Sequence, residues 1–408
     1  MASLNKVEAT GVLKEHYLPV VRVQINQRSE VLSQIEQSSD DVDQVGLEAV
    51  LSLQVGANEG IGSRLELEEL PEPGAARYIK ARVPLKYHYA QLQVSGPVIR
   101  AMRTDEGSWI RALESEQKGA TTGLRQDLSR QALGSGDGVI AQLAANVAGS
   151  TTLTVVATPT QLRSLRRGMK IDIGTVASPA SVASNRTIVA VNRTAKTITV
   201  DVAVAGATTT AHFIFRQGSG GAGASQRELT GLAAIISGTG TLFGVNPATE
   251  DVWASNVLAN GGGVLTDGNV NRLIDEVSIN SPDGVGNWAI TTHRIVREYA
   301  NSLTKTFSNT TELNGGFTAI EVGTASGRVA LQAVPEAPQG RLYLVNREHL
   351  TMHEASDWEF MEEDGSALQR ITVGFGKDGY QATLFAYKEL ATDMRAAHGL
   401  ITGIQDDA

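Results

Sequence analysis

The chain has 408 residues, and its 35 Lys and Arg against 44 Asp and Glu leave a formal net charge of −9. This length is enough for two or three domains, and a content of 41% hydrophobic and 19% charged residues excludes a wholly disordered chain. The acidic balance argues against tight, sequence-specific binding of nucleic acid, and the lack of cysteine excludes disulfides and thiolate metal sites. We therefore expect folding in a reducing cytoplasm, and we find no apolar run that predicts a membrane span.

The first 45 residues predict an arm that packs on another surface. An apolar patch at residues 17–23 precedes a polar, helix-like run at residues 26–37, and neither segment can bury much by itself. A partly ordered terminus is the alternative interpretation.

The stretch at residues 65–94 predicts a β-hairpin with unlike strands. Leucines alternate with acidic residues in the first strand, a turn rich in Pro and Gly follows at residues 71–74, and the return strand is basic, with alternating apolar residues. A change of phase at residues 90–91 predicts a bulge or a strand break. Because an isolated two-stranded ribbon is marginal in water, we expect it to lie on a neighbouring subunit. The candidate inter-subunit contacts are Leu65, Leu67, Glu68, Glu69, Arg77, Tyr78, Lys80 and Arg82.

A long amphipathic helix is predicted at residues 109–133. Its apolar residues recur at steps of four or seven, which places them on one narrow stripe, and Gly134 follows as a stop signal. Two glycines interrupt the helix and predict either a weak or bent rod or the close approach of another backbone. The residues that define this helix are Trp109, Leu113, Gly119, Gly123, Leu124 and Leu128.

The residue composition changes at residues 150–216. Five short runs rich in Thr, Val and Ile are separated by Gly, Pro, Ser and Asn, a spacing typical of a small antiparallel sandwich or barrel. Linkers of small residues flank these runs, so we interpret the segment as an inserted β-domain. Within it, Arg163, Arg166 and Arg167 form a basic cluster, which we interpret as a solvated face rather than a binding site.

After the second linker the chain returns to a mixed α+β pattern. Helices are predicted at residues 228–236, 269–277 and 292–303, because their apolar residues share one face. Buried strands are predicted at residues 289–290 and 341–345.

Two motifs match chemical sites only in part. The stretch from Gly218 to Gly223 has the spacing of a dinucleotide-binding loop, but the acidic residue expected about 20 positions further on is missing. His349 and His353 lie near acidic residues, but the sequence lacks the order of a zinc peptidase, so we interpret them as part of a surface turn. We find no catalytic constellation and expect no enzyme, no cofactor and no metal.

The C-terminal part contains the most informative order of elements. It places GRLYLVN at residues 340–346, DWEFMEEDG at 357–365, YQATLFAYKEL at 380–390 and HGLITGI at 398–404. Together with the arm, the hairpin and the long helix, this order resembles the major capsid proteins of tailed bacteriophages, which have the Hong Kong 97-type fold. The resemblance implies an α+β fold with an N-terminal arm, an extended loop, a spine helix with a long β-ribbon and an axial domain, plus an inserted small all-β domain.

On this resemblance the chain divides into six parts. These are the N-terminal arm at residues 1–45, the extended hairpin loop at 46–95, a peripheral domain with the spine helix at 96–148, the inserted β-domain at 149–218, the axial domain at 219–350, and the peripheral β-ribbon with the C-terminus at 351–408.

The resemblance implies a structural protein that self-assembles into hexamers and pentamers of an icosahedral viral head around double-stranded DNA. The implied partners are further copies of the chain, a scaffolding protein, a portal, a decoration protein and, non-specifically, the packaged DNA, with no membrane. The implied location is the virion, after assembly in the host bacterial cytoplasm. Lys80 and Lys86 lie in the loop that cross-links in some family members, but no partner Asn can be assigned.

Three alternatives remain open from the sequence. The first is an encapsulin-like nanocompartment shell with the same fold. The second is a nucleotide-dependent enzyme that uses the loop from Gly218 to Gly223. The third is a phage tail or adhesion protein built from the β-domain.

Overall fold

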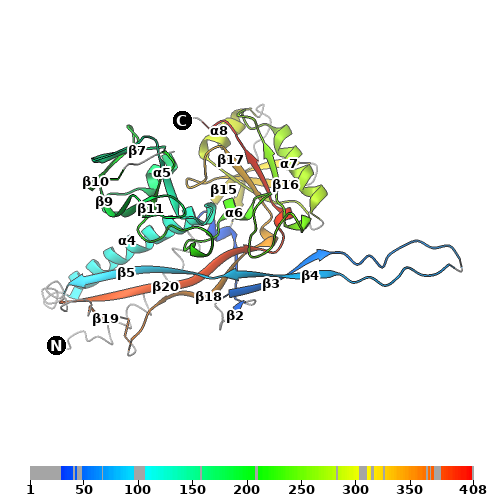
Figure 1. The fold of residues 1–408 in the computed structure, drawn as a ribbon, viewed down its shortest axis with the longest axis horizontal. Helices are drawn as coiled ribbons and strands as arrows, with labels where there is room; N and C mark the ends of the chain where they lie inside the picture. Colours follow the sequence, from blue (N-terminus) through cyan, green and yellow to red (C-terminus); the bar gives the residue numbers. More distant parts are fainter. Residues whose placement is uncertain are drawn as a thin grey trace.

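The computed structural model shows an elongated, mixed α+β subunit from which one hairpin projects far beyond the body (Figure 1). It describes residues 29–39, 42–43, 48–66, 68–95, 106–156, 159–206, 210–281, 284–302, 310–313, 317–324, 327–363, 366–367, 369–371 and 378–406. Within these ranges the strands form four sheets, one of which is a closed barrel.

A long ribbon with one long helix along it forms the base of the subunit (Figure 1). Its elements are α4 (Glu106–Leu133), β1 (Glu36–Ser38), β5 (Lys86–Ser95), β18 (Leu350–Phe360), β19 (Gln369–Arg370) and β20 (Gly379–Thr392). β20 is central: it pairs antiparallel with β18 on one side and with β5 on the other. Alternate residues of β20, Ala382, Leu384 and Ala386, share the largest core cluster with Leu128 and Ala132 of α4, because strand side chains alternate between faces.

The helix predicted at residues 109–133 is present as α4, but one interpretation of its glycines is wrong. A Cβ atom built on Gly119 would meet nothing within 4 Å, and one built on Gly123 would lie 3.8 Å from Arg166 Nη1. No other described backbone therefore approaches α4 at either glycine, and close backbone packing is not the reason for them.

The segment predicted as β-rich forms the closed barrel, with strand order β10-β7-β6-β11-β8-β9. Its elements are β6 (Val139–Leu143), β7 (Ser150–Val156), α5 (Pro159–Ser164), β8 (Lys170–Gly174), β9 (Ala183–Asn192), β10 (Thr197–Val204) and β11 (Phe213–Arg216). The barrel encloses its own cluster of buried aliphatic residues. The expected boundary at residue 149 is wrong for this unit, because β6 lies before it and pairs with both β7 and β11.

A seven-stranded sheet with helices packed on it forms the second large unit, with order β12-β21-β17-β13-β16-β15-β14. Its elements are β12 (Asn256–Ala259), α7 (Asp267–Asn280), β13 (Trp288–Thr291), α8 (His293–Ser302), β14 (Thr310–Leu313), β15 (Phe317–Thr324), β16 (Gly327–Ala333), β17 (Arg341–Val345) and β21 (Gly399–Thr402). The expectation that residues 351–408 all belong to the ribbon is wrong, because β21 pairs with β12 and β17 in this sheet. Its Leu400 and Ile401 are buried there.

The hairpin prediction for residues 65–94 is also wrong in its strands. The third open sheet contains β2 (Val42–Asp43), β3 (Glu48–Gly56) and β4 (Arg77–Pro84). β3 pairs with β4, whereas residues 65–70 form no strand within the described positions. Their alternation of leucine and glutamate resembles a half-buried strand, but Leu65 and Leu70 are left exposed by the described residues. The expected bulge at residues 90–91 is absent: β5 keeps a continuous register with β20, and the break falls at Leu85.

The segments between these units are short and irregular. The helix-like run at residues 26–37 is not a long helix in its described part, which holds η3 (Leu32–Gln34) followed by β1, and the apolar patch at residues 17–23 lies outside the described residues. The helix predicted at residues 228–236 is reduced to α6 (Leu232–Ile235). The remaining single turns are η4 (Gly223–Ser225), η5 (Asp251–Trp253), η6 (Arg347–His349) and η7 (Arg395–Ala397).

Candidate assembly surfaces

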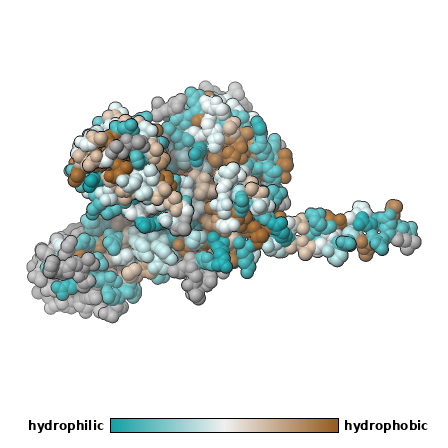
Figure 2. Space-filling view, in the orientation of Figure 1, coloured by the Kyte–Doolittle hydropathy of each residue, from teal (hydrophilic) through white to brown (hydrophobic). Residues whose placement is uncertain are grey.

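A loop at residues 57–76, here called the projecting loop, extends from the end of β3 and β4 into solvent (Figure 1). Ile61, Leu65 and Leu70 keep 81%, 75% and 83% of their surface exposed. The loop also carries five glutamates and one arginine. Figure 2 shows apolar and hydrophilic residues interspersed along this projection. Large apolar side chains on an exposed, acidic loop indicate a surface that becomes buried in a complex.

Local contacts shape the projecting loop without covering its apolar side chains. A Cβ atom on Gly60 would lie 2.6 Å from the backbone nitrogen of Gly74, so only glycine allows the two limbs to come this close. The backbone N–H of Leu65 donates to Glu68 Oε2 (2.9 Å), and Arg64 Nε donates to the carbonyl oxygen of Glu69 (2.9 Å).

The base of the hairpin is anchored to the body, unlike its tip. Arg77 forms an ion pair with Glu250, and the backbone N–H of Arg82 donates to the carbonyl oxygen of Phe243 (3.2 Å). The buried face of the hairpin packs on the tryptophan of η5. The residues of this cluster include Ala49, Leu51, Leu53, Ala81, Val83 and Trp253.

A groove of about 1280 Å³ runs between strands β4 and β5, helix α4 and the segment that follows the barrel. Two carboxylates line it, Asp127 and Glu228, but both already bind Arg130, at 3.3 Å and 2.7 Å. The groove is therefore basic overall, with aromatic and aliphatic side chains between the charges. Its basic lining residues are Lys80, Arg82, Lys86, Arg216 and Arg227.

Buried ion pairs fix the floor of this groove. Arg130 joins α4 to Glu228 of the segment after the barrel, and Gln131 Nε2 donates to Asp127 Oδ2 (3.0 Å). Although burial opposes its charge, the carboxylates of Glu228 and Asp127 hold the pKa of Arg130 above its usual value. Removing one partner would leave a buried charge uncompensated, so the network ties α4 firmly to the segment after the barrel.

A buried carboxylate ties the ribbon to the same segment. Glu389 of β20 accepts the backbone N–H groups of Thr230 (2.7 Å) and Leu390 (3.0 Å), and Lys86 Nζ lies 4.0 Å away. Burial raises the pKa of Glu389 to about 7, while the charge of Lys86 and the backbone donors oppose that rise.

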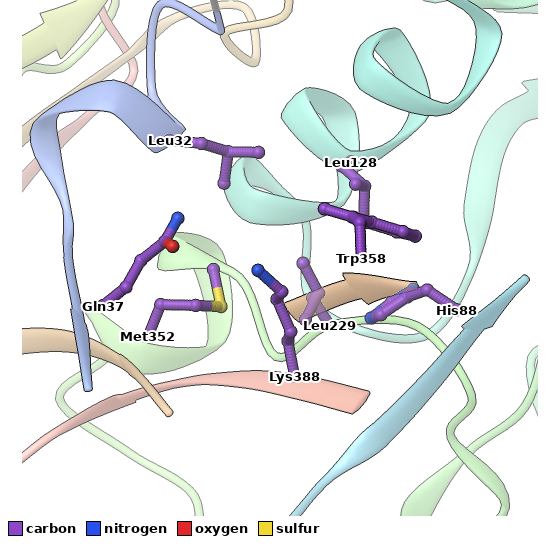
Figure 3. Close-up of a pocket in the computed structure, with 8 residues that line it drawn as sticks. All are labelled: Leu32, Gln37, His88, Leu128, Leu229, Met352, Trp358 and Lys388. Atoms are coloured by element: carbon purple, nitrogen blue, oxygen red, sulfur yellow. The ribbon is translucent and has the colours of Figure 1, made fainter. Parts of the chain in front are cut away.

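A small internal cavity of about 20 Å³ lies where the arm, α4 and the ribbon meet, and Figure 3 shows the side chains that converge on it. Lys388 Nζ donates to Asp357 Oδ1 (2.8 Å), and the ammonium lies 5.8 Å from the centre of the Trp358 ring. Burial lowers the pKa of His88 to about 4, so its imidazole is neutral at physiological pH. The space admits about one water molecule, which is too little for a substrate.

The candidate site residues chosen from the sequence separate into two places. Leu65, Glu68 and Glu69 lie on the projecting loop, whereas Lys80 and Arg82 line the groove and Tyr78 is exposed on β4 between them. Leu67 lies outside the described residues. Sequence reasoning did not select Ile61, Arg216 or Arg227, and it noted Lys86 only as a lysine of the loop. The groove residues come from distant segments, so no local spacing could reveal them as one surface.

The helix residues chosen from the sequence differ in their surroundings. Leu128 is buried against the ribbon, and Leu124 is half-buried at the groove. Gly119 is open to solvent, and Gly123 faces the barrel through Arg166. The side chains of Trp109 and Leu113 lie outside the described residues.

The two motifs noted in the sequence have ordinary packing roles. After Gly218 the chain enters only the single turn η4, which offers no helix N-terminus for a pyrophosphate, and a Cβ atom on Gly220 would lie 2.5 Å from the Phe215 ring. His349 Nδ1 contacts Asp393 Oδ1 (2.9 Å). The expectation of a surface turn is wrong for His353, which is buried in β18.

Among the described residues, no three His, Asp or Glu side chains are placed to hold a metal ion. The described helices also include none whose length and hydropathy suit a membrane crossing.

These elements together define the fold of a phage capsid protein. The chain is similar to the capsid protein of cyanophage A-1(L), with a TM-score of 0.54, 12% sequence identity and 93% of each chain covered. Weaker likenesses are to the capsid of a native GTA particle (TM-score 0.46, 10% identity, 93% and 90% covered) and to the SrpI encapsulin of Synechococcus elongatus PCC 7942 (TM-score 0.44, 10% identity, 91% and 85% covered). A scan of the sequence against protein-family models gives no match, and a search of the curated proteins gives none either. The similarity to the cyanophage capsid protein therefore shows the fold.

Proposed function

We propose that this chain is the major capsid protein of a tailed, double-stranded DNA bacteriophage, and that it forms hexamers and pentamers of an icosahedral head. The observation that carries the proposal is that one subunit has both an exposed, acidic loop with large apolar side chains and a basic groove of suitable size. A loop that projects away from its own groove can fill only the groove of another copy, so the contact repeats from subunit to subunit.

In Hong Kong 97-type terms, we assign the projecting loop to the extended loop and α4 with β5, β18 and β20 to the spine and ribbon. The seven-stranded sheet then corresponds to the axial domain, and the barrel to an inserted domain between spine and axial domain. The proposed division keeps the sequence-based order but starts the inserted domain at Val139 and places β21 in the axial domain. A scaffolding protein, a portal, a decoration protein and packaged DNA are the further partners of this proposal, with assembly in the host cytoplasm.

Assembly draws its stability from the loop. Burying Ile61, Leu65 and Leu70 on a neighbour contributes about 1.5–3 kcal/mol each, which offsets part of the cost of association. The glutamates of the loop and the basic lining of the groove add electrostatic complementarity, which favours one register of contact over others.

The test removes the loop without disturbing its base. Deleting residues 61–73 joins Gly60 to Gly74, whose backbones already touch, so β3 and β4 keep their pairing. We expect a folded subunit that forms no closed shells in negative-stain electron micrographs, in the presence of any required scaffold. Closed shells from the deletion variant would contradict the role of the loop.

A charge exchange tests the groove separately. Glu66→Lys with Glu72→Lys, or Lys80→Glu with Arg227→Glu, should each abolish shells, and the four substitutions together should restore them. Failure of the combined variant, with both single-sided variants folded, would mean that the loop binds elsewhere. The contents of purified shells decide between a phage head and a protein-loaded compartment, because only the former contains the phage genome.

A further inference from the structure

A second basic site lies on the barrel and shares only Arg216 with the basic residues of the groove. A cleft of about 420 Å³ opens between the turn that follows α5 and the end of β11. The turn supplies Arg166 and Arg167, the start of β8 supplies Lys170, and the end of β11 supplies Arg216. Four cationic side chains therefore line one cleft on a chain whose net charge is −9.

The three arginines that the sequence groups together do not act as one surface. Arg163 turns away to the second large unit, where its Nη1 lies 3.5 Å from Glu336 Oε1. Arg166 and Arg167 instead line the cleft together with Lys170, which is close in sequence, and Arg216, which is distant. The interpretation of this cluster as a solvated face agrees with the exposure of Arg163 and Arg167, but it does not account for the cleft.

The cations of the cleft lack matching carboxylates. Arg216 Nη2 lies 3.7 Å from Asp127 Oδ1, but Asp127 is already bound by Arg130 and Gln131. Within the described chain, Arg166, Arg167 and Lys170 have no carboxylate at ion-pair distance, and the buried Nε of Arg216 has no hydrogen-bond acceptor. Burial and the nearby charge of Arg216 lower the pKa of Arg166, which reflects how closely these cations are crowded.

The backbone holds this arrangement in place. Gly168 N donates to the carbonyl oxygen of Ile188 (2.8 Å), Met169 N to that of Arg166 (3.1 Å), and Gln217 N to that of Lys170 (3.0 Å). Both segments of the cleft are therefore tied into the barrel. Because these amides are occupied, a ligand must be bound by the cationic side chains.

We propose that this cleft binds phosphate oxyanions carried by a polyanion, such as a free polyphosphate or the backbone of a nucleic acid. Guanidinium groups donate pairs of parallel hydrogen bonds that match phosphate oxygens, and a cluster of them neutralises several charges at once. The cleft has room for more than one phosphate group, and an anion there would relieve the repulsion between Arg166 and Arg216. This inference does not depend on shell formation, because Arg166, Arg167 and Lys170 line the cleft and not the groove.

The test compares two variants of the full chain that lose the same charges on the same barrel. Arg167→Gln with Lys170→Gln removes two exposed cations of the cleft, whereas Arg193→Gln with Lys196→Gln removes two exposed cations of the turn between β9 and β10. Isothermal titration calorimetry with sodium tripolyphosphate measures the small ligand, and fluorescence anisotropy with a labelled DNA duplex measures the polymer. Polyglutamate of matched charge serves as the carboxylate competitor.

We expect the cleft variant to bind tripolyphosphate about tenfold or more weakly, while the control variant binds like the wild-type chain. If DNA is the polymer that binds, the dependence of its affinity on salt should fall by about 1.8 in logarithmic slope in the cleft variant, as expected for two lost phosphate contacts. Binding of tripolyphosphate without DNA would restrict the ligand to a small polyphosphate. Equal losses in the two variants, or equally tight binding of polyglutamate, would overturn the proposal.

Discussion

Replacing the two glycines of α4 with alanine should stabilise the subunit. A Cβ atom at Gly119 meets no atom within 4 Å, and at Gly123 it makes an ordinary contact of 3.8 Å with Arg166 Nη1. Neither substitution therefore incurs a steric cost that would offset the gain in helix propensity. That gain is about 0.5–1 kcal/mol per residue, so Gly119→Ala with Gly123→Ala should raise the free energy of unfolding by roughly 1–2 kcal/mol.

The matched control is a glycine with no such space. Gly231 has an ordinary φ of −84°, but its Cβ atom would lie 2.2 Å from the carbonyl oxygen of Gln131 and 2.5 Å from that of Gly134. Gly231→Ala should therefore destabilise the subunit, because the end of α4 must move. Urea unfolding followed by far-ultraviolet circular dichroism measures both variants. A less stable double variant, or a tolerated Gly231→Ala, would refute the reasoning from spacing.

The same double variant tests whether the glycines serve assembly. If α4 bends as a shell changes curvature, a stiffer helix should alter particle size or maturation although the subunit is more stable. Particles of normal size and maturation would mean that the glycines have no role in curvature.

The remaining predictions concern buried ionisable groups. As the pH falls from about 6.5 to about 4, the unfolded chain binds a proton that the buried imidazole of His88 does not bind in the folded chain. His88 should therefore contribute a loss of roughly 3 kcal/mol of stability over this range, and His88→Gln should remove that contribution. The contribution of Glu389 to stability has the opposite sign. Its raised pKa of about 7 means that the folded subunit takes up a proton at a higher pH than the unfolded chain does. Glu389 should therefore add stability as the pH falls from about 7 to about 4.5, and Glu389→Gln should abolish that gain. Urea midpoints of the two variants and the wild type across this range check both, and parallel pH profiles would contradict them. Glu228→Gln removes the closest partner of the buried Arg130, at 2.7 Å, and should lower the free energy of unfolding by about 3 kcal/mol. Glu276→Gln breaks the exposed pair with Arg272 and should lower it by about 0.5 kcal/mol or less. Equal losses in urea unfolding would argue against a buried network.

Local sequence patterns predicted those elements whose buried and exposed faces are set by the residues of one continuous segment. The stripe of α4, the Thr- and Val-rich runs of the barrel and the order of strands at the C-terminus are all visible without any partner. Where the pattern misled, a tertiary cause explains it. The leucines of residues 65–70 alternate like those of a strand, but Leu65 and Leu70 are exposed in this subunit. Strand β21 follows the ribbon in sequence, but it pairs with β12 and β17.

The sequence by itself determined the succession of arm, loop, long helix, β-domain and mixed domain, because amphipathic period and turn residues act over a few positions. Only the tertiary structure decided the groove and the basic cleft. Lys86 and Arg227 meet across the groove, and Arg166 and Arg216 meet across the cleft, although long stretches of chain separate the members of each pair. Charges from distant segments become a surface only when sheet pairing brings those segments together, and no local spacing carries that information.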